Sequence, residues 1–324
     1  MRRRALLLGA VAALVAPNVT GAQPAKKTYR IGWLSPESAA NGKPNLDALR
    51  QGLGELGYVE KRNLVIETRW AEDDTQRLPA LAAELVRLNV DLICTAGTPA
   101  TAAAKGATTK IPIVFASAAF PDETGLVASY ARPGANATGV AFVGPEYGKR
   151  LELLKEIRPG IARVALIYNP ENKASVRALR ETERWAKSLT VALEPRAFHP
   201  QARESLFGAI ATKLPDALMT TADPVILSHR KPIVDFANKH RLLAMYPLRE
   251  FVDEGGLVFY GASVPEMYRR AAVYIDRILK GAAPQNLPVE EPVKFDMVIN
   301  ARVAKTLGIT IPKSVLLRAD RVIE

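Results

Sequence analysis

Short runs of apolar residues alternate along this chain with longer segments in which apolar positions recur every three or four residues. The run from Tyr29 to Ser35 predicts a buried strand, and four leucines between Leu46 and Leu56 then mark one face of a helix over about Asn45 to Leu56. The predicted strands are 29–35, 63–70, 92–95, 111–117, 138–143, 163–168, 191–198, 217–221, 242–246, 257–261 and 294–299. Helical segments separate most of them, an alternation that is typical of parallel strands joined by crossover helices. The chain is therefore predicted to have an α/β fold.

The alternation occurs twice. A first run ends near residue 143, and a second run of comparable size begins with the helix predicted over Glu146 to Ile157. At 324 residues the chain is long enough for two domains of ordinary size. We therefore predict two similar Rossmann-like lobes, each built on a parallel sheet.

Several predicted strands are followed by a polar residue and a proline. Thr98-Pro99 follows the turn at Ala96-Gly97, and Asn169-Pro170 and Asp223-Pro224 follow two strands of the second run. A polar N-cap with proline at the first helical position favours the start of a helix. In open α/β sheets, ligands bind where such helix N-termini meet the carboxyl ends of the strands. The pattern predicts a ligand crevice at this edge.

Side chains at these strand ends are the candidate ligand contacts. Ser35, Thr98 and Ser117 offer hydroxyl groups, and Gly97 forms the turn before the helix. The helix N-termini expected at Thr98 and Asn169 offer N–H donors and positive dipole ends, which suit a carboxylate.

Three further candidates have two interpretations each. Asp223 could pair with a ligand ammonium or could simply cap the helix that follows it. Tyr246 and Tyr260 end strands near the expected hinge, where they could stack on a flat ligand or pack within the hinge. Together these residues suggest a small zwitterion or organic acid as the ligand.

The N-terminus has the pattern of a cleavable export signal. Arg2 to Arg4 form a positive segment, Ala5 to Ala16 form an apolar segment too short to cross a bilayer, and small residues at Thr20 and Ala22 fit a cleavage site. We predict a signal peptide over residues 1–22 and a mature chain from Gln23, with export by the general or the twin-arginine route left open. No cysteine lies near the cleavage site, so no lipid anchor is expected.

Composition argues against several other classes of protein. The net charge is +11, but acidic residues are interleaved with basic ones beyond the leader, which is unlike a nucleic-acid-binding face. Cys94 is the single cysteine and falls within a predicted buried strand, so neither a disulfide nor a cysteine metal site is expected. The three histidines have no ligand spacing, and no nucleophile motif is present. We predict no enzyme activity, no metal and no cofactor.

One combination of segments resembles a known family. They are Thr95–Ala104, Ile111–Phe115, Gly125–Ser129, Arg132–Gly139, Leu151–Glu156 and Val164–Pro170. Together they are similar to the solute-binding component of ABC importers of the TrpX-like group, over essentially the whole mature chain. The sequence departs from that pattern at residues 118–123, where relatives often carry a turn containing Asp-Pro.

The resemblance implies a type I periplasmic binding protein fold, in which two α/β lobes are joined by a three-segment hinge and the ligand lies between them. It implies an N-terminal lobe of residues 28–142 plus about 258–284, and a C-terminal lobe of residues 143–257 plus about 285–324. The implied function is to bind a small polar or aromatic amino-acid-like ligand in the periplasm by hinge closure. The expected partner is an ABC permease of the inner membrane, and a monomer is the default state. A sensory receptor, or more distantly a periplasmic enzyme, is an alternative.

Overall fold

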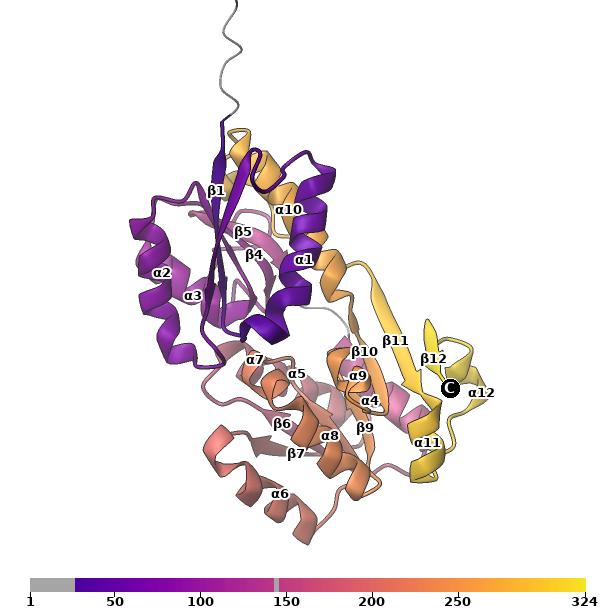
Figure 1. The fold of residues 1–324 in the computed structure, drawn as a ribbon. Coiled ribbons are helices and arrows are strands. Elements are labelled where there is room, and N and C mark those ends of the chain that lie inside the picture. The colour runs from indigo at the N-terminus through magenta and orange to yellow at the C-terminus, as the bar shows by residue number, and fades with distance from the viewer. Residues whose placement is uncertain (1–26, 143–145) are drawn as a thin grey trace, which may run out of the picture.

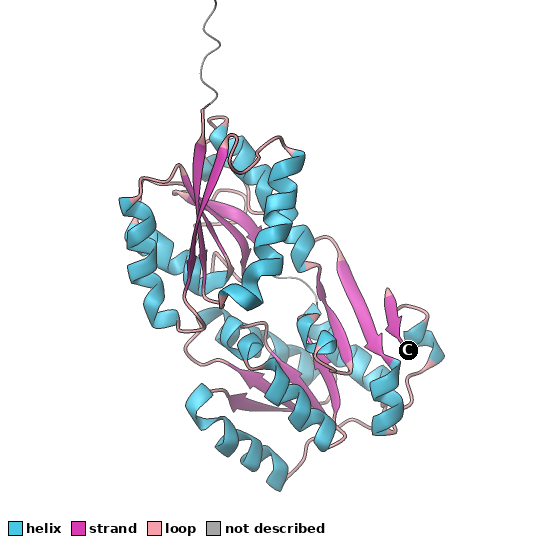
Figure 2. Cartoon of the chain, viewed as in Figure 1, coloured by secondary structure: helices cyan, strands magenta, loops and turns pink. Residues whose placement is uncertain are grey.

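The computed structural model describes residues 27–142 and 146–324, which form two lobes, each around its own sheet (Figures 1 and 2). The predicted signal peptide lies outside the described residues. Within the described residues, no helix is both long enough and apolar enough to cross a membrane.

The first lobe contains a five-stranded parallel sheet in the order β2-β1-β3-β4-β5. Its strands are β1 (Tyr29–Ser35), β2 (Leu64–Trp70), β3 (Leu92–Thr95), β4 (Ile113–Ala118) and β5 (Ala137–Ala141). Its helices are α1 (Ala39–Glu55), η1 (Thr75–Arg77), α2 (Leu78–Arg87), α3 (Gly97–Ala107), α10 (Val264–Leu279) and η3 (Pro284–Asn286). Figure 1 shows α2 and α3 on one face of the sheet and α1 beside α10 on the other.

The second lobe contains a seven-stranded sheet in the order β12-β11-β10-β9-β8-β6-β7. Its strands are β6 (Arg163–Tyr168), β7 (Ala192–Ala197), β8 (Ala217–Thr220), β9 (Leu243–Tyr246), β10 (Val258–Ala262), β11 (Phe295–Asn300) and β12 (Arg321–Ile323). Its helices are α4 (Glu146–Ile157), α5 (Lys173–Ser188), η2 (Pro200–Ala202), α6 (Arg203–Thr212), α7 (Pro224–Ser228), α8 (Arg230–Lys239), α9 (Glu250–Asp253), α11 (Ala301–Leu307) and α12 (Lys313–Leu316). All neighbouring strands are parallel except β10 and β11, which are antiparallel.

The chain passes between the lobes three times: between β5 and α4, between β10 and α10, and between α10 and β11. The predicted first lobe included residues 258–284, and this assignment needs correction at its start. Val258–Ala262 forms β10, which pairs with β9 and β11 in the second sheet, whereas α10 packs on α1 and β4 of the first lobe. The crossover therefore falls near Ser263. Apolar periodicity shows that a strand exists but does not show which sheet it joins.

The core of the first lobe explains why these segments form their elements. Ile31, Trp33 and Leu34 of β1 are fully buried, as are Leu49 and Leu53 of α1. α1 begins at Ala39 rather than near Asn45, because Ser38 caps it by accepting a hydrogen bond from the Asn41 N–H. The helix ends before Gly57, whose φ of +87° fits the predicted stop.

Candidate functional site

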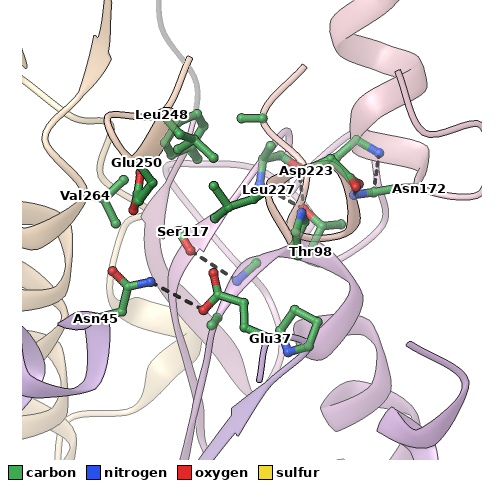
Figure 3. Close-up of a pocket in the computed structure, with 18 of the residues that line it drawn as sticks. Glu37, Asn45, Thr98, Ser117, Asn172, Asp223, Leu227, Leu248, Glu250 and Val264 are labelled. Carbon is green, nitrogen blue, oxygen red and sulfur yellow. Dashed lines mark hydrogen bonds between the residues drawn. The ribbon is translucent and has the colours of Figure 1, made fainter. Parts of the chain in front are cut away.

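The carboxyl ends of strands from both sheets border a pocket between the lobes. Its cavity volume is about 70 Å³, and it opens to solvent. The polar residues that line it are Glu37, Asn45, Thr98, Ser117, Asn172, Asp223, Glu250 and Tyr268. Figure 3 shows Leu227 among them, with Asp223 and Asn172 on one side of it and Asn45 and Glu250 on the other.

The start of α3 is fixed by contacts to the end of β4. The Gly97 N–H donates to Ser117 Oγ at 3.1 Å, and Gly97 has a φ of +76°, a conformation that suits glycine. Thr98 Oγ1 accepts from the Ala119 N–H at 2.9 Å and lies 3.3 Å from the Ala119 carbonyl oxygen. The prediction that Thr98 is the N-cap is wrong: α3 begins at Gly97, so its N-cap is Ala96, two residues earlier, and it has no side-chain cap. The Thr98 hydroxyl instead joins two loops of the first lobe.

Asp223 joins several of the polar groups that the second lobe places at the pocket. It caps α7, accepting from the Ile226 N–H at 3.0 Å, so the predicted capping role is confirmed. Its carboxylate also accepts from the side-chain amides of Asn169, at 3.1 and 3.2 Å, and Asn172, at 2.8 Å. Burial raises the pKa of Asp223, and these hydrogen bonds oppose the rise. No cationic side chain is among these partners.

The two asparagines differ from their predicted arrangement. α5 begins at Lys173 with Asn172 as its N-cap, so the helix N-terminus predicted at Asn169 lies three residues further along the chain. Asn169 forms a local turn, its Oδ1 accepting from the Glu171 N–H at 3.0 Å, and its amide orients Asp223 from behind the pocket.

Glu37 lies at the first-lobe end of the pocket, two residues after β1. Its side chain is only 6% exposed. Ser35 Oγ accepts from the Glu37 N–H at 3.2 Å and lies 3.4 Å from Oε2, while the Asn45 amide donates to Oε2 at 3.5 Å. Burial and the nearby Glu250 carboxylate raise the pKa of Glu37 to about 7.

The predicted site residues divide into two equal groups. Gly97, Thr98, Ser117 and Asp223 line the pocket. Ser35, Asn169, Tyr246 and Tyr260 do not.

Each of the second group has other contacts. Ser35 and Asn169 lie directly behind Glu37 and Asp223. The Tyr246 ring is fully buried and stacks on Phe251 at 4.6 Å. Tyr260 stacks on Phe295 of the neighbouring strand at 6.3 Å between centroids. The stacking predicted for both tyrosines is thus with the protein's own rings.

Sequence reasoning missed Glu37, Asn45, Asn172, Glu250 and Tyr268 as pocket residues. Glu37 and Asn172 could have been found by extending the strand-end rule two to four residues past each strand. Asn45 and Tyr268 come from the sides of helices α1 and α10, and Glu250 begins the one-turn helix α9. No local sequence signal marks these three positions.

Contacts outside the pocket also join the lobes. Arg177 of α5 forms an ion pair with Glu123 in the loop after β4, and its guanidinium lies 4.8 Å from the centroid of the Phe120 ring. Elsewhere, Arg230 of α8 donates to Asn41 Oδ1 of α1 at 3.2 Å. Each of these contacts joins a residue of the second lobe to a residue of the first.

The polar side chains that line the pocket are acidic or neutral. No Lys, Arg or His is among the described residues that line the pocket. Within the described part of the chain, no group of three or more His, Cys, Asp or Glu side chains could hold a metal ion. The pocket combines carboxylates, amides and hydroxyls with apolar walls formed by residues such as Phe142, Leu248 and Val264.

Comparison with known proteins shows which family this chain resembles. A family model described as ABC transporter substrate binding protein matches residues 43–323. A tyrosine-binding protein from Clostridioides difficile is 27% identical over 273 residues, which are 82% of this chain and 77% of that protein. The solved structure of an ABC domain in complex with L-Trp, from Streptococcus pneumonia, is 26% identical with a TM-score of 0.87, covering 92% of this chain and 100% of that one.

More distant structures show the fold alone. A leucine-binding protein from Thermotoga maritima is 16% identical, with a TM-score of 0.57 over 80% of this chain and 78% of that one. The predicted type I periplasmic binding protein fold is confirmed, as is the resemblance on which it partly depended. The matched family and both closer relatives are described as binding proteins or transporter domains, not as enzymes.

Proposed function

Because the chain belongs to the family of ABC transporter substrate-binding proteins, we propose that it binds an amino acid with an apolar or aromatic side chain between its lobes. It then delivers this ligand to an ABC permease of the inner membrane. The relatives described as binding tyrosine and L-Trp support this ligand class.

The observation that carries the proposal is the charge of the pocket lining. Glu37, Asp223 and Glu250 are lining residues, and no basic side chain accompanies them in the described lining. A buried carboxylate without a cationic partner is costly, and a cation supplied by the ligand would offset that cost. An amine-bearing ligand fits such a site better than an anion does.

Asp223 is the proposed partner of the ligand ammonium. The donors to its carboxylate, the Ile226 N–H and the amides of Asn169 and Asn172, are all neutral. A ligand ammonium would supply the positive charge that these donors lack.

The ligand carboxylate is proposed to lie at the N-terminus of α3. The first N–H groups of a helix have no partner within the helix. Ser117 accepts from the Gly97 N–H, which leaves the Thr98 N–H for the ligand. The Ser117 hydroxyl, also in the lining, is available as a further donor, whereas the Thr98 hydroxyl is bonded to Ala119.

Binding is proposed to act by hinge closure. The ligand would touch residues of both lobes, so it would favour the closed arrangement over an open one. The three crossings of the chain between the lobes and the Arg177–Glu123 contact across them are consistent with such a motion. We further propose export to the periplasm through the signal at residues 1–22, and action as a monomer.

Calorimetric titration of the mature chain, from Gln23 onward, with the common amino acids tests the function. We expect Asp223→Asn to lower the affinity for the bound amino acid by about 10- to 100-fold, because a charge-assisted hydrogen bond is lost. The same variant should bind the matching hydroxy acid, which lacks the amine, as the unmodified protein does.

Asp216→Asn is the matched control. Asp216 precedes β8, whereas Asp223 follows it. The Asp216 carboxylate accepts from the N–H groups of Ala162 and Arg163, and none of these three residues lines the pocket. Equal effects of the two substitutions, or no binding of any amino acid, would contradict the proposed function.

A further inference from the structure

One carboxylate of the pocket has no role in binding the backbone groups of an amino acid. Glu37 belongs to the first lobe, and Asn45 and Glu250 near it lie across Leu227 from Asp223 in Figure 3. If the ligand ammonium binds Asp223, this second polar group faces the other end of the ligand. The step rests on the proposed function.

The hydrogen bonds of Glu37 are one-sided. Ser35 Oγ and the Asn45 amide both approach Oε2, at 3.4 and 3.5 Å. No donor of the described residues is within hydrogen-bond distance of Oε1. The side chain is 94% buried and lines the pocket, so its second oxygen has an unmet capacity to accept a hydrogen bond.

The structure also holds this carboxylate in place from behind. A Cβ atom on Gly42 of α1 would lie 2.7 Å from Glu37 Oε2 and 2.4 Å from the Trp70 ring. The absence of a side chain at Gly42 thus leaves room for the carboxylate beside α1. A larger residue at position 42 would displace the Glu37 carboxylate from this position.

The pocket lining near Glu37 contains a second acidic side chain and, among the described residues, no basic one. Glu250 lines the same region, and Val264 and Leu248 form apolar wall beside it. Such a site binds more tightly a ligand that has one N–H or O–H group on an otherwise apolar side chain. A ligand without that group leaves the buried acceptor oxygen without a hydrogen bond, which lowers the affinity.

We infer that Glu37 is a specificity-determining residue that accepts a hydrogen bond from an N–H or O–H group on the ligand's side chain. The protein therefore selects side-chain donors among apolar and aromatic amino acids. A phenol or an indole meets this requirement, and a plain phenyl ring does not.

Two pairs of probes test the inference by calorimetric titration: tyrosine against phenylalanine, and tryptophan against 3-benzothienylalanine, which replaces the indole N–H by sulfur. In at least one pair, we expect the unmodified protein to bind the amino acid with the side-chain donor about 10-fold or more tightly than the one without it. Glu37→Met keeps the length of the side chain but removes the acceptor. It should remove most of this preference, measured as the ratio of the two affinities within each pair, because that ratio cancels any change common to both probes.

Glu37→Gln, which keeps an acceptor oxygen, is the conservative variant and should restore part of the preference. Circular dichroism and thermal unfolding establish that both variants fold. Binding of both members of each pair with equal affinity, or an equal loss for all probes in Glu37→Met, overturns this inference but not the proposed function. Failure of every amino acid to bind overturns the proposed function and this inference with it.

Discussion

The contact between Arg177 and Glu123 gives the sharpest test of coupling between lobe closure and affinity. Arg177 belongs to the second lobe, whereas Glu123 and Phe120 belong to the first. If the lobes separate in the open state, this contact exists only in the closed state. Arg177→Gln, which removes the charge, should therefore weaken ligand binding although Arg177 does not line the pocket.

The structure sets the size of the effect. Glu123 is 48% exposed and Arg177 19%, so their ion pair contributes only about 0.2–1 kcal/mol. The guanidinium over the Phe120 ring, at 4.8 Å, adds about 0.5–1 kcal/mol. A loss of about 1–2 kcal/mol from the closed state alone raises the apparent Kd about 5- to 30-fold when the unliganded protein is mainly open.

Isothermal titration at low and high salt measures this effect. The difference between Arg177→Gln and the unmodified protein should shrink at 1 M salt, because screening removes the ionic part and leaves the contact with the ring. Arg184→Gln is the matched control: Arg184 is on the same helix and pairs with Glu181 of its own lobe. Equal affinities for the two variants would refute the reasoning that the Arg177 contact favours closure.

Two further predictions concern stability. Gly139→Ala should lower the free energy of unfolding by at least about 2 kcal/mol, since a Cβ atom there would lie 1.9 Å from the Phe115 carbonyl oxygen at a φ of +149°. Gly208→Ala, in an exposed helix with nothing within 4 Å, should instead add up to about 1 kcal/mol; urea unfolding that ranks the two the other way would contradict this. Because the pKa of Glu37 is raised from 4.5 to about 7, its contribution to stability is complete below pH 4.5 and is lost as the pH rises to 7. The Tm of Glu37→Gln minus the Tm of the unmodified protein should therefore increase between pH 4.5 and 7, by the equivalent of about 3 kcal/mol. A Tm difference that does not change with pH would exclude the raised pKa of Glu37.

Hydrophobic periodicity was enough to predict the alternation of strands and helices and the two-lobed α/β fold. Capping signals were reliable where they depended on a few neighbouring residues, as at Asp223 and at Gly57. Cys94 is fully buried in β3, as its apolar surroundings predict. These features could be read from the sequence because the interactions behind them act within about one helical turn or one strand.

The same local rules failed where a distant segment offered a better partner. Thr98 has the sequence of an N-cap, but its hydroxyl bonds to Ala119, 21 residues away. β10 joins the second sheet by pairing with β9 and with β11, which lies more than 30 residues later in the chain.

The pocket was therefore decided mostly by tertiary structure. The sequence placed Gly97, Ser117 and Asp223 at strand ends, and all three line the pocket. It could not show that Ser35 lies behind Glu37, or that Tyr246 stacks on Phe251. A strand brings its end to the edge of a sheet whatever surrounds it, but the direction of each side chain there depends on how segments from both lobes pack against it.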